Sequence, residues 1–508
     1  MPSSHRLYYL TSCVANCVFR REVQAWGLPL RRLREVGLRD SFSTIPGADK
    51  QRFGLRQAPA CFGSQEADKG DMGDMMEKFC VERQSLGDEV RSAVEDLGWP
   101  SRISRRWTRP GDAGVGSGVE DDDGAFAGGA GGPEGGMKLK VLQWNVLCDG
   151  LSGSHPEKGG FVRAPEDSLD WEKRRWKILE EILSWDCDVL ALQEVDHHHD
   201  WLSPMLARGG YRSLFVKKPL APGKEYGPDL EDGCSVFYRS RRGSPTGDGE
   251  SAGTQQAQTT LELLDSHGFT FAVAEGPGGE GGFPEAGGGH AAPRIQNQVA
   301  ILALFRVHRA GCGDGEATEE DAKGRQGSLV VLATTHLKAV KTEGGEEARA
   351  RQASQLLSEV ERFREGHAAG RGLPSRSIPV VISGDFNATP RATRTGGKDG
   401  GGYEPLCYRR IVSHPLKLQS AFPLVEDTYT TFKIRRVTSA EGGQGTASGV
   451  ETTLRETCHC IDYVWMSEGV RAARLSSFPA VEQLGPERIP SYAYPSDHLA
   501  LAVELLLP

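Results

Sequence analysis

The sequence predicts an α/β protein in which helices pack on the outside of β-sheets. Several short apolar runs rich in Val, Ile and Leu are typical of strands that are buried on both faces. Two longer segments repeat apolar residues at helical spacing. These strand-like and helix-like segments alternate from about residue 137 onwards. Because the strands lack the alternation of a half-exposed sheet, we expect helices to cover them.

Composition divides the 508 residues into three segments. Residues 1–60 carry ten Lys/Arg against four acids, which is typical of an organelle transit peptide or of a basic extension. Residues 61–136 carry sixteen acids against eight bases and end in a Gly-rich tract, so we predict an acidic disordered linker with one short helix that has no obvious partner. Residues 137–508 then form the folded domain.

The predicted elements of this domain follow from periodicity. The helix at 170–185 places Trp171, Ile178, Leu179, Ile182 and Leu183 on one face, with Asp170 or Ser168 as its N-cap. A second amphipathic helix covers 346–363. The predicted strands are 139–147, 188–195, 234–239, 299–305, 329–337, 379–387, 461–466 and 497–507. Gly-rich insertions, which we expect to be surface loops, lie near 243–258, 275–292, 310–327, 393–402 and 439–450.

Bulk properties restrict the class of protein. The eleven cysteines are scattered, which favours a reduced intracellular compartment, either cytoplasm or mitochondrion. Cys458 and Cys460 lack a second thiol pair, so structural cysteines are favoured over a zinc site, and the adjacent His197, His198 and His199 are expected in a solvated loop. No apolar run reaches the roughly 20 residues that span a membrane. We expect a monomer.

The charge of the folded domain bears on its partners. Residues 137–508 carry a net charge of −7, because the two preceding segments contribute +6 and −8 to the whole-chain charge of −9. A mildly acidic domain is poorly suited to holding long nucleic acid by charge alone. A local basic pocket is still compatible with this balance.

Six apolar strands carry a polar, chemistry-bearing residue at one end. A single instance, such as the turn that Gly384 and Asp385 could form, is ordinary turn chemistry. Repetition at six strand ends instead predicts that these side chains converge on one site. The residues are Asn145, Glu194, His336, Asp385 with Asn387, Asp462, and Asp497 with His498.

Convergence of these side chains would require a cation. Glu194, Asp385, Asp462 and Asp497 would bring up to four carboxylates together, and like charges a few Å apart raise one another's pKa. A divalent metal relieves this repulsion, and oxygen ligands favour Mg²⁺, or Mn²⁺, over Zn²⁺. Such a site suits hydrolysis of a phosphate ester. The chain contains neither a G-x-S-x-G motif nor a P-loop.

Six motifs carry a family resemblance. In chain order they are "QWNVL", "LQEVD", "THLKA", "GDFNA", "DYVW" and "PSDHL". Together they resemble the endonuclease/exonuclease/phosphatase superfamily over about residues 138–508. The resemblance implies a four-layer α/β sandwich, in which two mixed β-sheets pack face to face with helices outside and the site lies at one rim.

Further segments narrow the resemblance to the deadenylase-like branch that includes the nocturnins. They include "LQEVDHHHDWLSPML", "YTTFKIR" and "LGPERIPSYAYPSDHLAL". This likeness implies a magnesium-dependent phosphatase that removes the 2′-phosphate of NADP⁺ and NADPH to give NAD⁺ and NADH. The wider deadenylase group shortens poly(A) RNA from its 3′ end, which is the alternative function. A non-catalytic binding module is disfavoured because no catalytic position is replaced.

The resemblance also implies a role for each matching residue. Catalytic roles fall on Asn145, His336, Asp385, Asn387, Asp462 and His498, and metal binding falls on Glu194 and Asp497. The implied substrate contacts are Glu194, Lys218, Pro219, Leu220, Asn297, His336, Leu337, Lys338, Ala339, Asp385, Phe386, Asn387, Arg435 and His498.

The chain departs from the family pattern at one position. Related proteins carry an arginine directly after "THLKA", where this chain has Val340. Lys341 is the nearest replacement, with Arg349 and Arg351 at longer reach. Because Lys lacks the planar two-pronged donor of Arg, we expect looser recognition of phosphate.

Overall fold

The computed structural model describes residues 85–111, 137–155, 159–221, 231–240, 259–273, 294–308, 327–394, 402–424, 428–438 and 452–508. The predicted N-terminal extension at 1–60 lies outside the described residues, and so do the Gly-rich insertions apart from a few residues at their ends. Among the described helices, none is long and apolar enough to cross a membrane.

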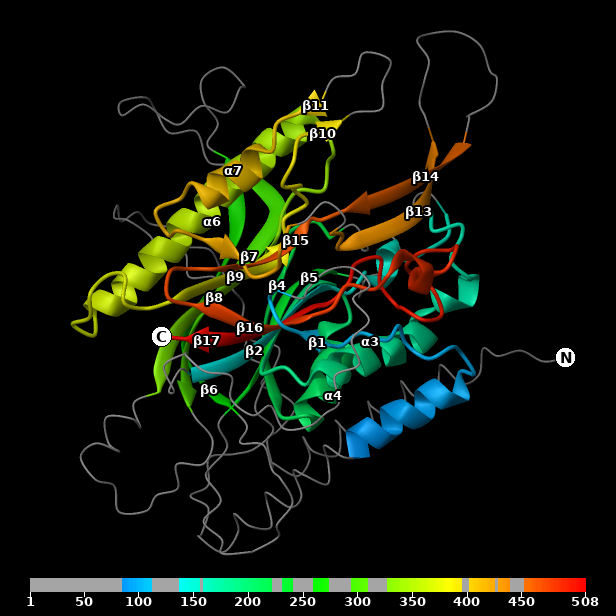
Figure 1. The fold of residues 1–508 in the computed structure, drawn as a ribbon, viewed down its shortest axis with the longest axis horizontal. Helices are drawn as coiled ribbons and strands as arrows, with labels where there is room; N and C mark the ends of the chain where they lie inside the picture. The colour runs from blue at the N-terminus through cyan, green and yellow to red at the C-terminus, as the bar shows by residue number, and fades with distance from the viewer. Residues whose placement is uncertain are drawn as a thin grey trace, which may run out of the picture. The chain divides into compact units, whose positions relative to one another are not determined.

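Two large mixed β-sheets form the centre of the fold (Figure 1). In spatial order, the seven-stranded sheet contains β1 (Trp107–Thr108), β16 (Arg471–Ser476), β17 (Leu501–Leu507), β2 (Met137–Asn145), β3 (Val189–Val195), β5 (Gly233–Arg239) and β4 (Tyr211–Lys217). The six-stranded sheet contains β12 (Gln419–Ser420), β15 (Asp462–Met466), β9 (Val380–Asp385), β8 (Ser328–His336), β7 (Arg294–His308) and β6 (Thr260–Val273). Only β2–β3 and β8–β9 pair in parallel among these strands.

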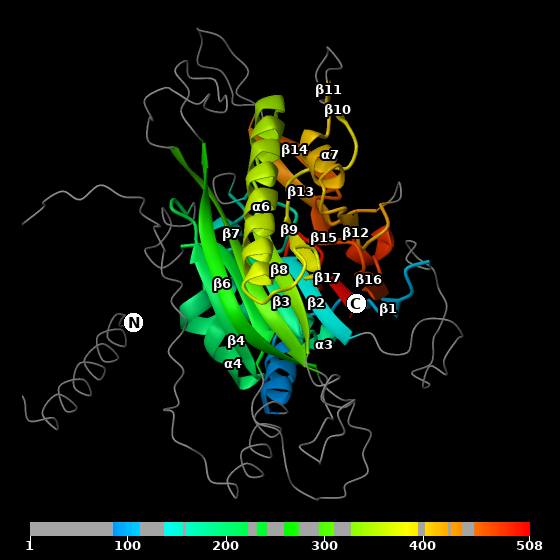
Figure 2. The same cartoon turned by 90° about the vertical axis from the view of Figure 1, so that its left-hand side faces the viewer.

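Helices cover the outer faces of the two sheets, and the four-layer α/β sandwich is therefore confirmed. Helices α3 (Trp171–Trp185) and α4 (Ser203–Arg208) bury apolar side chains against the seven-stranded sheet. Helix α6 (Glu343–Ala369) runs along the six-stranded sheet, as Figure 2 shows, and α7 (Leu406–Val412) packs beside it.

Strand β7 shows why the apolar runs are continuous. Its residues alternate between two cores because successive side chains of a strand point to opposite faces. Val299, Ile301, Ala303 and Phe305 belong to the core that includes the space between the sheets, whereas Ala300, Leu302 and Leu304 belong to the core beneath α6. Because both faces of this stretch of the strand are buried in apolar cores, every residue from Val299 to Phe305 is apolar and the sequence shows no alternation.

Most predicted elements are observed, with small shifts at their ends. Asp170 is the N-cap of α3, and its carboxylate accepts a hydrogen bond from the backbone N–H of Glu172 at 3.1 Å. The sequence did not predict β4, β6 or β16, whose residues mix polar and apolar types because their side chains are only partly buried. The expected solvated loop at the three histidines is wrong for His198, which is buried and lies within 2.9 Å of the Ser235 hydroxyl.

Smaller elements complete the described structure. A hairpin of β13 (Thr431–Thr438) and β14 (Thr452–His459) projects beside the sheets (Figure 1). The others are β10 (Thr393–Arg394) with β11 (Gly402–Tyr403), the 3₁₀ turns η2 (Asp149–Leu151), η4 (Glu166–Ser168) and η7 (Val481–Leu484), and the π-helical turn η5 (His198–Leu202).

Part of the predicted linker belongs to the folded domain. Residues 85–96 are helical, and Leu86 and Val90 are buried in the core that contains α3 and α4. Further along, Arg105 is buried and ion-pairs with the buried Glu181 of α3 at 3.4 Å. Residues 85–111 therefore pack against the domain that the sequence predicted to begin only at residue 137. Their spacing of apolar residues was visible in the sequence, but the surface that they cover was not.

We expect Leu86→Ala to lower the free energy of unfolding by about 2–4 kcal/mol, because it leaves a cavity where the side chain is fully buried. Urea unfolding followed by circular dichroism measures this loss. Ser92→Ala, on the exposed side of the same helix, is the matched control and should change little. Equal stability of the two variants would show that the helix is not part of the cooperative unit.

Candidate active site

Sheet register places three of the predicted site residues side by side. In the six-stranded sheet, His336 at the end of β8 is the direct partner of Asp385 at the end of β9. Asp462, at the start of the antiparallel β15, is the partner of Asp385 on its other side. Neighbouring strands lie about 4.8 Å apart, so this register alone brings an imidazole and two carboxylates together.

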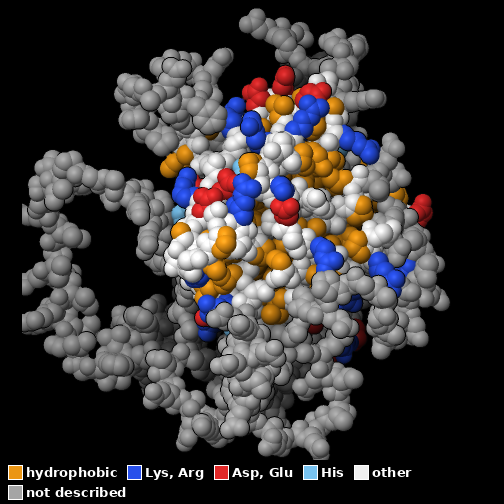
Figure 3. All heavy atoms as spheres, turned by 60° about the vertical axis from the view of Figure 1, so that its left-hand side comes forward, with side chains coloured by type: hydrophobic (Ala, Val, Ile, Leu, Met, Phe, Trp, Pro, Cys, Tyr) orange, Lys and Arg blue, Asp and Glu red, His pale blue; other side chains and the backbone are white. Residues whose placement is uncertain are grey.

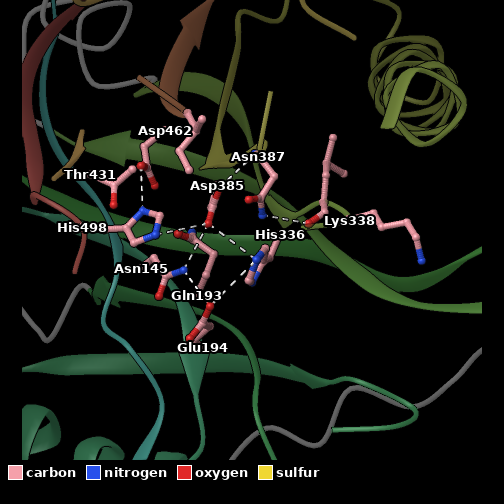
Figure 4. A network of polar contacts seen from close by, with 12 residues as sticks. Asn145, Gln193, Glu194, His336, Lys338, Asp385, Asn387, Thr431, Asp462 and His498 are labelled. Carbon is pink, nitrogen blue, oxygen red and sulfur yellow. Dashed lines mark hydrogen bonds and ion pairs between the residues drawn. The ribbon is translucent and has the colours of Figure 1, made fainter. Parts of the chain in front are cut away.

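The seven-stranded sheet delivers the other residues to the same rim. Asn145 ends β2, and its side-chain amide donates to Glu194 Oε1 at 2.9 Å and to Asp385 Oδ2 at 3.1 Å (Figure 4). Glu194 lies at a β-bulge in β3 with a φ of 55°. His498 precedes β17, which pairs with β2, and the indole N–H of Trp144 donates to the His498 carbonyl at 2.7 Å. The side-chain amide of Asn145 therefore connects the rims of the two sheets.

His498 and Asp462 form a hydrogen-bonded couple. His498 Nδ1 lies 2.8 Å from Asp462 Oδ2, and Nε2 lies 3.8 Å from Asp385 Oδ2. The Thr430 hydroxyl also donates to Asp462 Oδ2, at 2.6 Å. An imidazole held in this way has a fixed orientation and a defined nitrogen for the carboxylate. Its free Nε2 faces the centre of the site.

Burial and charge together set the protonation of the couple. Burial disfavours the imidazolium, but the carboxylates of Asp462, Asp497 and Asp385 outweigh it and raise the pKa of His498 to about 9. Burial raises the pKa of Asp462, and the neighbouring Asp385 adds to this effect while His498 opposes it. His498 is therefore a cation at neutral pH in this arrangement.

The remaining site groups divide into ionised acids and a neutral base. Burial raises the pKa of Asp385, but His498 and His336 more than offset it and leave the pKa lowered. The pKa of Glu194 is also lowered, because His336 and Lys218 outweigh its desolvation. Burial, with Lys218 nearby, lowers the pKa of His336. At neutral pH the site therefore offers carboxylates beside a neutral imidazole.

Asn387 is held rigidly next to Asp385. Its backbone N–H donates to Asp385 Oδ1 at 2.9 Å, and its side-chain amide donates to the carbonyl of Leu337 at 3.1 Å. Its φ of 52° is uncommon for a residue with a side chain, although Asn tolerates this region better than most. The turn chemistry seen in the sequence is therefore present and also positions a polar side chain.

The predicted substrate contacts are only partly brought to this site. Lys218 is buried and ion-pairs with the buried Asp232, while the exposed Leu220 exchanges backbone hydrogen bonds with the Asn297 side chain. Arg435 donates to the Gly159 carbonyl, and its guanidinium lies 5.0 Å from the centre of the Phe161 ring. Pro219 and Ala339 are exposed.

Three of the predicted contacts do not present their side chains to the carboxylates of this site. The side chains of Leu337 and Phe386 are each 1 % exposed and belong to the core beneath α6, so only their backbone atoms border the site. Lys338 is half-buried, and Figure 4 shows its side chain directed away from the carboxylates. The alternation that directs His336 and Asp385 towards the site turns the side chains of the residues after them into the core.

Sequence reasoning missed several residues that support the site. Lys433 on β13 ion-pairs with Asp497, and it keeps the pKa of that buried carboxylate well below its ordinary value. Gln143 and Gln193 are fully buried and hydrogen-bond to each other beneath the site. Their presence inside otherwise apolar strands was a signal that could have identified them.

Oxygen donors in the site fit a hard divalent cation. Within the described structure, Glu194 has no Lys or Arg nitrogen within 4.0 Å, and its oxygens receive one bond from Asn145 and a long one, 3.4 Å, from the N–H of Cys148. Asp497, in contrast, is already neutralised by Lys433. Asp385, Asp462 and His498 also have ligand atoms within 4.8 Å of one another. Two of these three residues, His498 and Asp462, are already hydrogen-bonded to each other.

Comparison with known proteins places these residues in a wider context. The family model described as "Endonuclease/Exonuclease/phosphatase family" matches residues 142–498. Nocturnin of Xenopus laevis is 32 % identical over 377 residues, which cover 72 % of each chain, and Homo sapiens nocturnin is 30 % identical, with 72 % of this chain and 64 % of that protein covered. The Ccr4 3′-5′-exoribonuclease subunit of Neurospora crassa is 24 % identical over 73 % of this chain and 46 % of its own length.

A solved structure is similar as well. The human nocturnin catalytic domain with bound sulfate aligns with a TM-score of 0.47 at 23 % identity, covering 80 % of this chain and 99 % of that chain.

Lys433→Met should lower the free energy of unfolding by about 3 kcal/mol, because it leaves the buried Asp497 carboxylate without its partner. Chemical denaturation at neutral pH measures this change. Lys417→Met is the matched control, since it removes an exposed pair with Glu468 and should cost at most about 1 kcal/mol. Adding Asp497→Asn to Lys433→Met should recover stability; no recovery would contradict the assigned cause.

Proposed function

The chain belongs to the endonuclease/exonuclease/phosphatase family and is a phosphoric ester hydrolase, and from this premise we propose that it removes the 2′-phosphate of NADP⁺ and NADPH in a magnesium-dependent reaction. The arrangement of Asn145, His336 and His498 around the Asp385 carboxylate supports hydrolysis of a phosphate ester. The likeness to nocturnins supports a dinucleotide phosphate as the substrate. The products would be NAD⁺ or NADH and inorganic phosphate.

The proton chemistry follows from the described protonation states. A water oxygen attacks phosphorus while the bond from phosphorus to the ribose 2′-oxygen breaks, and the departing 2′-oxygen takes up a proton from solvent to become a hydroxyl. The ionised Asp385 accepts a proton from that water, because its pKa is lowered and its Oδ2 faces the site. The cationic His498 and the Asn387 amide donate hydrogen bonds to the phosphoryl oxygens, where negative charge develops, while the two N–H groups of Asn145 hold Glu194 and Asp385 in place.

His336 completes the set of donors. Its pKa is lowered, so it contributes a neutral N–H beside the reacting group. Glu194 would hold the divalent metal, which when bound would neutralise charge on the phosphoryl oxygens. The predicted ligand Asp497 would act mainly through His498, because Lys433 already occupies its carboxylate.

A poly(A)-specific 3′-exoribonuclease is the second candidate. The 24 % identity with the Ccr4 exoribonuclease subunit favours it, and it would use the same catalytic residues. A long RNA track should present basic and aromatic side chains that lead to the site. On the face in Figure 3, basic, acidic and hydrophobic side chains of the described residues are interspersed, and the net charge of −7 on residues 137–508 disfavours a long basic track. We therefore rank the dinucleotide phosphate first.

The two candidates separate in a side-by-side assay. With Mg²⁺, the full chain should release inorganic phosphate from NADPH and leave an A-tailed RNA intact at substoichiometric enzyme. Asp385→Asn should lower the rate by about 10³-fold or more, because the base is lost while the fold is kept. Shortening of the RNA without release of phosphate from NADPH would reverse the ranking.

Metal binding can be measured without turnover. We expect Glu194→Gln to weaken binding of Mn²⁺ by at least about tenfold in calorimetric titration, because a charged oxygen ligand becomes a neutral amide. Asp497→Asn is the comparison and should have the smaller effect, since Lys433 already binds Asp497. Equal Mn²⁺ affinity in the wild type and in Glu194→Gln would exclude Glu194 as the ligand.

A further inference from the structure

Lys341 occupies an unusual place beside the catalytic groups. It lies between β8 and α6, directly before Thr342, the N-cap of α6, whose hydroxyl accepts from the N–H of Gly345 at 3.2 Å. The Lys341 ammonium donates to the backbone carbonyl and to Oδ1 of Asn387, both at 2.9 Å. Although Lys341 as a whole is an exposed residue, its charged end therefore contacts a buried residue of the site.

The loop that carries Lys341 is fixed by helix α6. Arg349 is 1 % exposed, and its guanidinium donates to the carbonyls of Lys338 at 2.9 Å and Val340 at 2.6 Å. Glu346 holds the same guanidinium at 2.7 Å. A Cβ at Gly345 would lie 2.2 Å from the Val340 carbonyl oxygen, so only glycine lets the helix begin this close to the loop. The backbone of Lys341 therefore has a defined position.

The charge of Lys341 is not neutralised by contact with an acid. Among the residues that the structure describes, no carboxylate lies within 4.0 Å of its Nζ. Lys218 and Lys433, in contrast, each ion-pair with a buried aspartate, and the side chain of Lys338 is directed away from the carboxylates. Both oxygens that Lys341 contacts belong to the neutral Asn387, so this ammonium keeps a full charge that can attract an incoming anion.

Donor geometry leaves one N–H of Lys341 available. A lysine ammonium has three N–H donors, and two of them go to Asn387. The side-chain amide of Asn387 donates to the Leu337 carbonyl, so this residue is held at both ends. The third donor of Lys341 can serve a ligand beside Asn387 without breaking either bond.

We propose that Lys341 binds a phosphoryl oxygen of the substrate and takes the place of the arginine that this chain lacks at Val340. The inference rests on the proposed function, because the ligand is the phosphate ester that this site hydrolyses. The single ammonium of Lys341 would replace the planar, two-pronged guanidinium of an arginine. Phosphate binding would then depend on this one ammonium and on its protonation. Arg349 and Arg351 do not compete for the role, since Arg349 binds backbone carbonyls and Arg351 pairs with Glu347 on the exposed side of α6.

The surroundings of Lys341 make its charge sensitive to pH. Desolvation, together with the nearby cations Arg349 and Lys433, lowers the pKa of Lys341 to about 8, although Asp385 and Asp462 oppose this change. The ammonium is therefore present at neutral pH and is lost as the pH rises through about 8. An arginine at the same position would stay charged across this range.

Sulfate is a suitable probe because it resembles phosphate and keeps its charge between about pH 7 and pH 9. We would measure its affinity by calorimetry for the full chain with Mg²⁺, in the wild type, Lys341→Met and Lys341→Arg. At neutral pH we expect Lys341→Met to weaken sulfate binding about tenfold or more, because a charge-assisted hydrogen bond is lost. Lys138→Met, at the opposite end of β2 from Asn145, is the matched control and should bind like the wild type.

The pH comparison isolates Lys341 from the other titrating groups. Wild-type affinity should fall between about pH 7 and pH 9, whereas Lys341→Arg should lose less, because both proteins share His498 and differ only in this cation. This comparison still tests the proposal if Lys341→Met fails to fold. The KM for NADPH should rise in Lys341→Met by a larger factor than kcat falls.

Other outcomes would overturn the proposal. Unchanged sulfate affinity and KM in Lys341→Met would show that no phosphoryl oxygen is bound there. A loss of kcat alone would show that Lys341 only orients Asn387. If the wild type binds sulfate through Lys341 but releases no phosphate from NADPH, the proposed function fails and this anion site stands.

Discussion

The Asp385 carboxylate is the contact through which two separate sheets make one site. Its Oδ2 accepts a hydrogen bond from Asn145 at 3.1 Å and lies 3.5 Å from His336 Nε2 and 3.8 Å from His498 Nε2. Asn145 ends β2 and His498 precedes β17, both strands of the seven-stranded sheet, whereas His336 and Asp385 end strands of the six-stranded sheet. The distance between the packed sheets therefore sets the geometry of the site, and a close-packed core resists changes in that distance. Packing of the core between the sheets therefore also fixes the distances between the site residues.

A layer of buried polar side chains, Gln143, Gln193 and Thr334, connects the two sheets beneath the site. Gln193 donates to Thr334 of the opposite sheet at 3.0 Å, and Gln143 lies 2.6 Å from Gln193 and 3.4 Å from Asp462. Buried amides without partners would destabilise the fold, whereas a satisfied network specifies one arrangement of its members. The layer thus fixes the register between the sheets at the point where Asp462 must meet His498. An apolar core alone would leave that register less defined.

Local sequence pattern predicted the parts of the molecule that depend on local rules. Buried strands and their polar ends were visible because the burial of a strand and the position of its last residue are both encoded within a few residues. Lys433 was not identified, because its partner Asp497 lies 64 positions further along the chain and only the β13–β14 hairpin brings them together. The burial of Phe386 was missed for a related reason: motif matching does not say to which side of the sheet a side chain turns. The docking of residues 85–111 likewise depends on a surface formed much later in the chain.

Backbone strain marks the points at which regular strand geometry cannot deliver a side chain to the site. Regular alternation along β3 would turn Glu194 towards the same face as Leu190 and Leu192, which belong to the hydrophobic core. The bulge and the left-handed φ of 55° break this alternation, at an expense of about 1–2 kcal/mol for a residue with a side chain. Asn387, with a φ of 52°, departs from β9 in the same way. Both residues are held by hydrogen bonds from neighbouring site residues, so the strain persists only because the rest of the site requires it. Regular strand geometry at these two positions would remove the local strain, but it would direct the side chain of residue 194 away from Asn145.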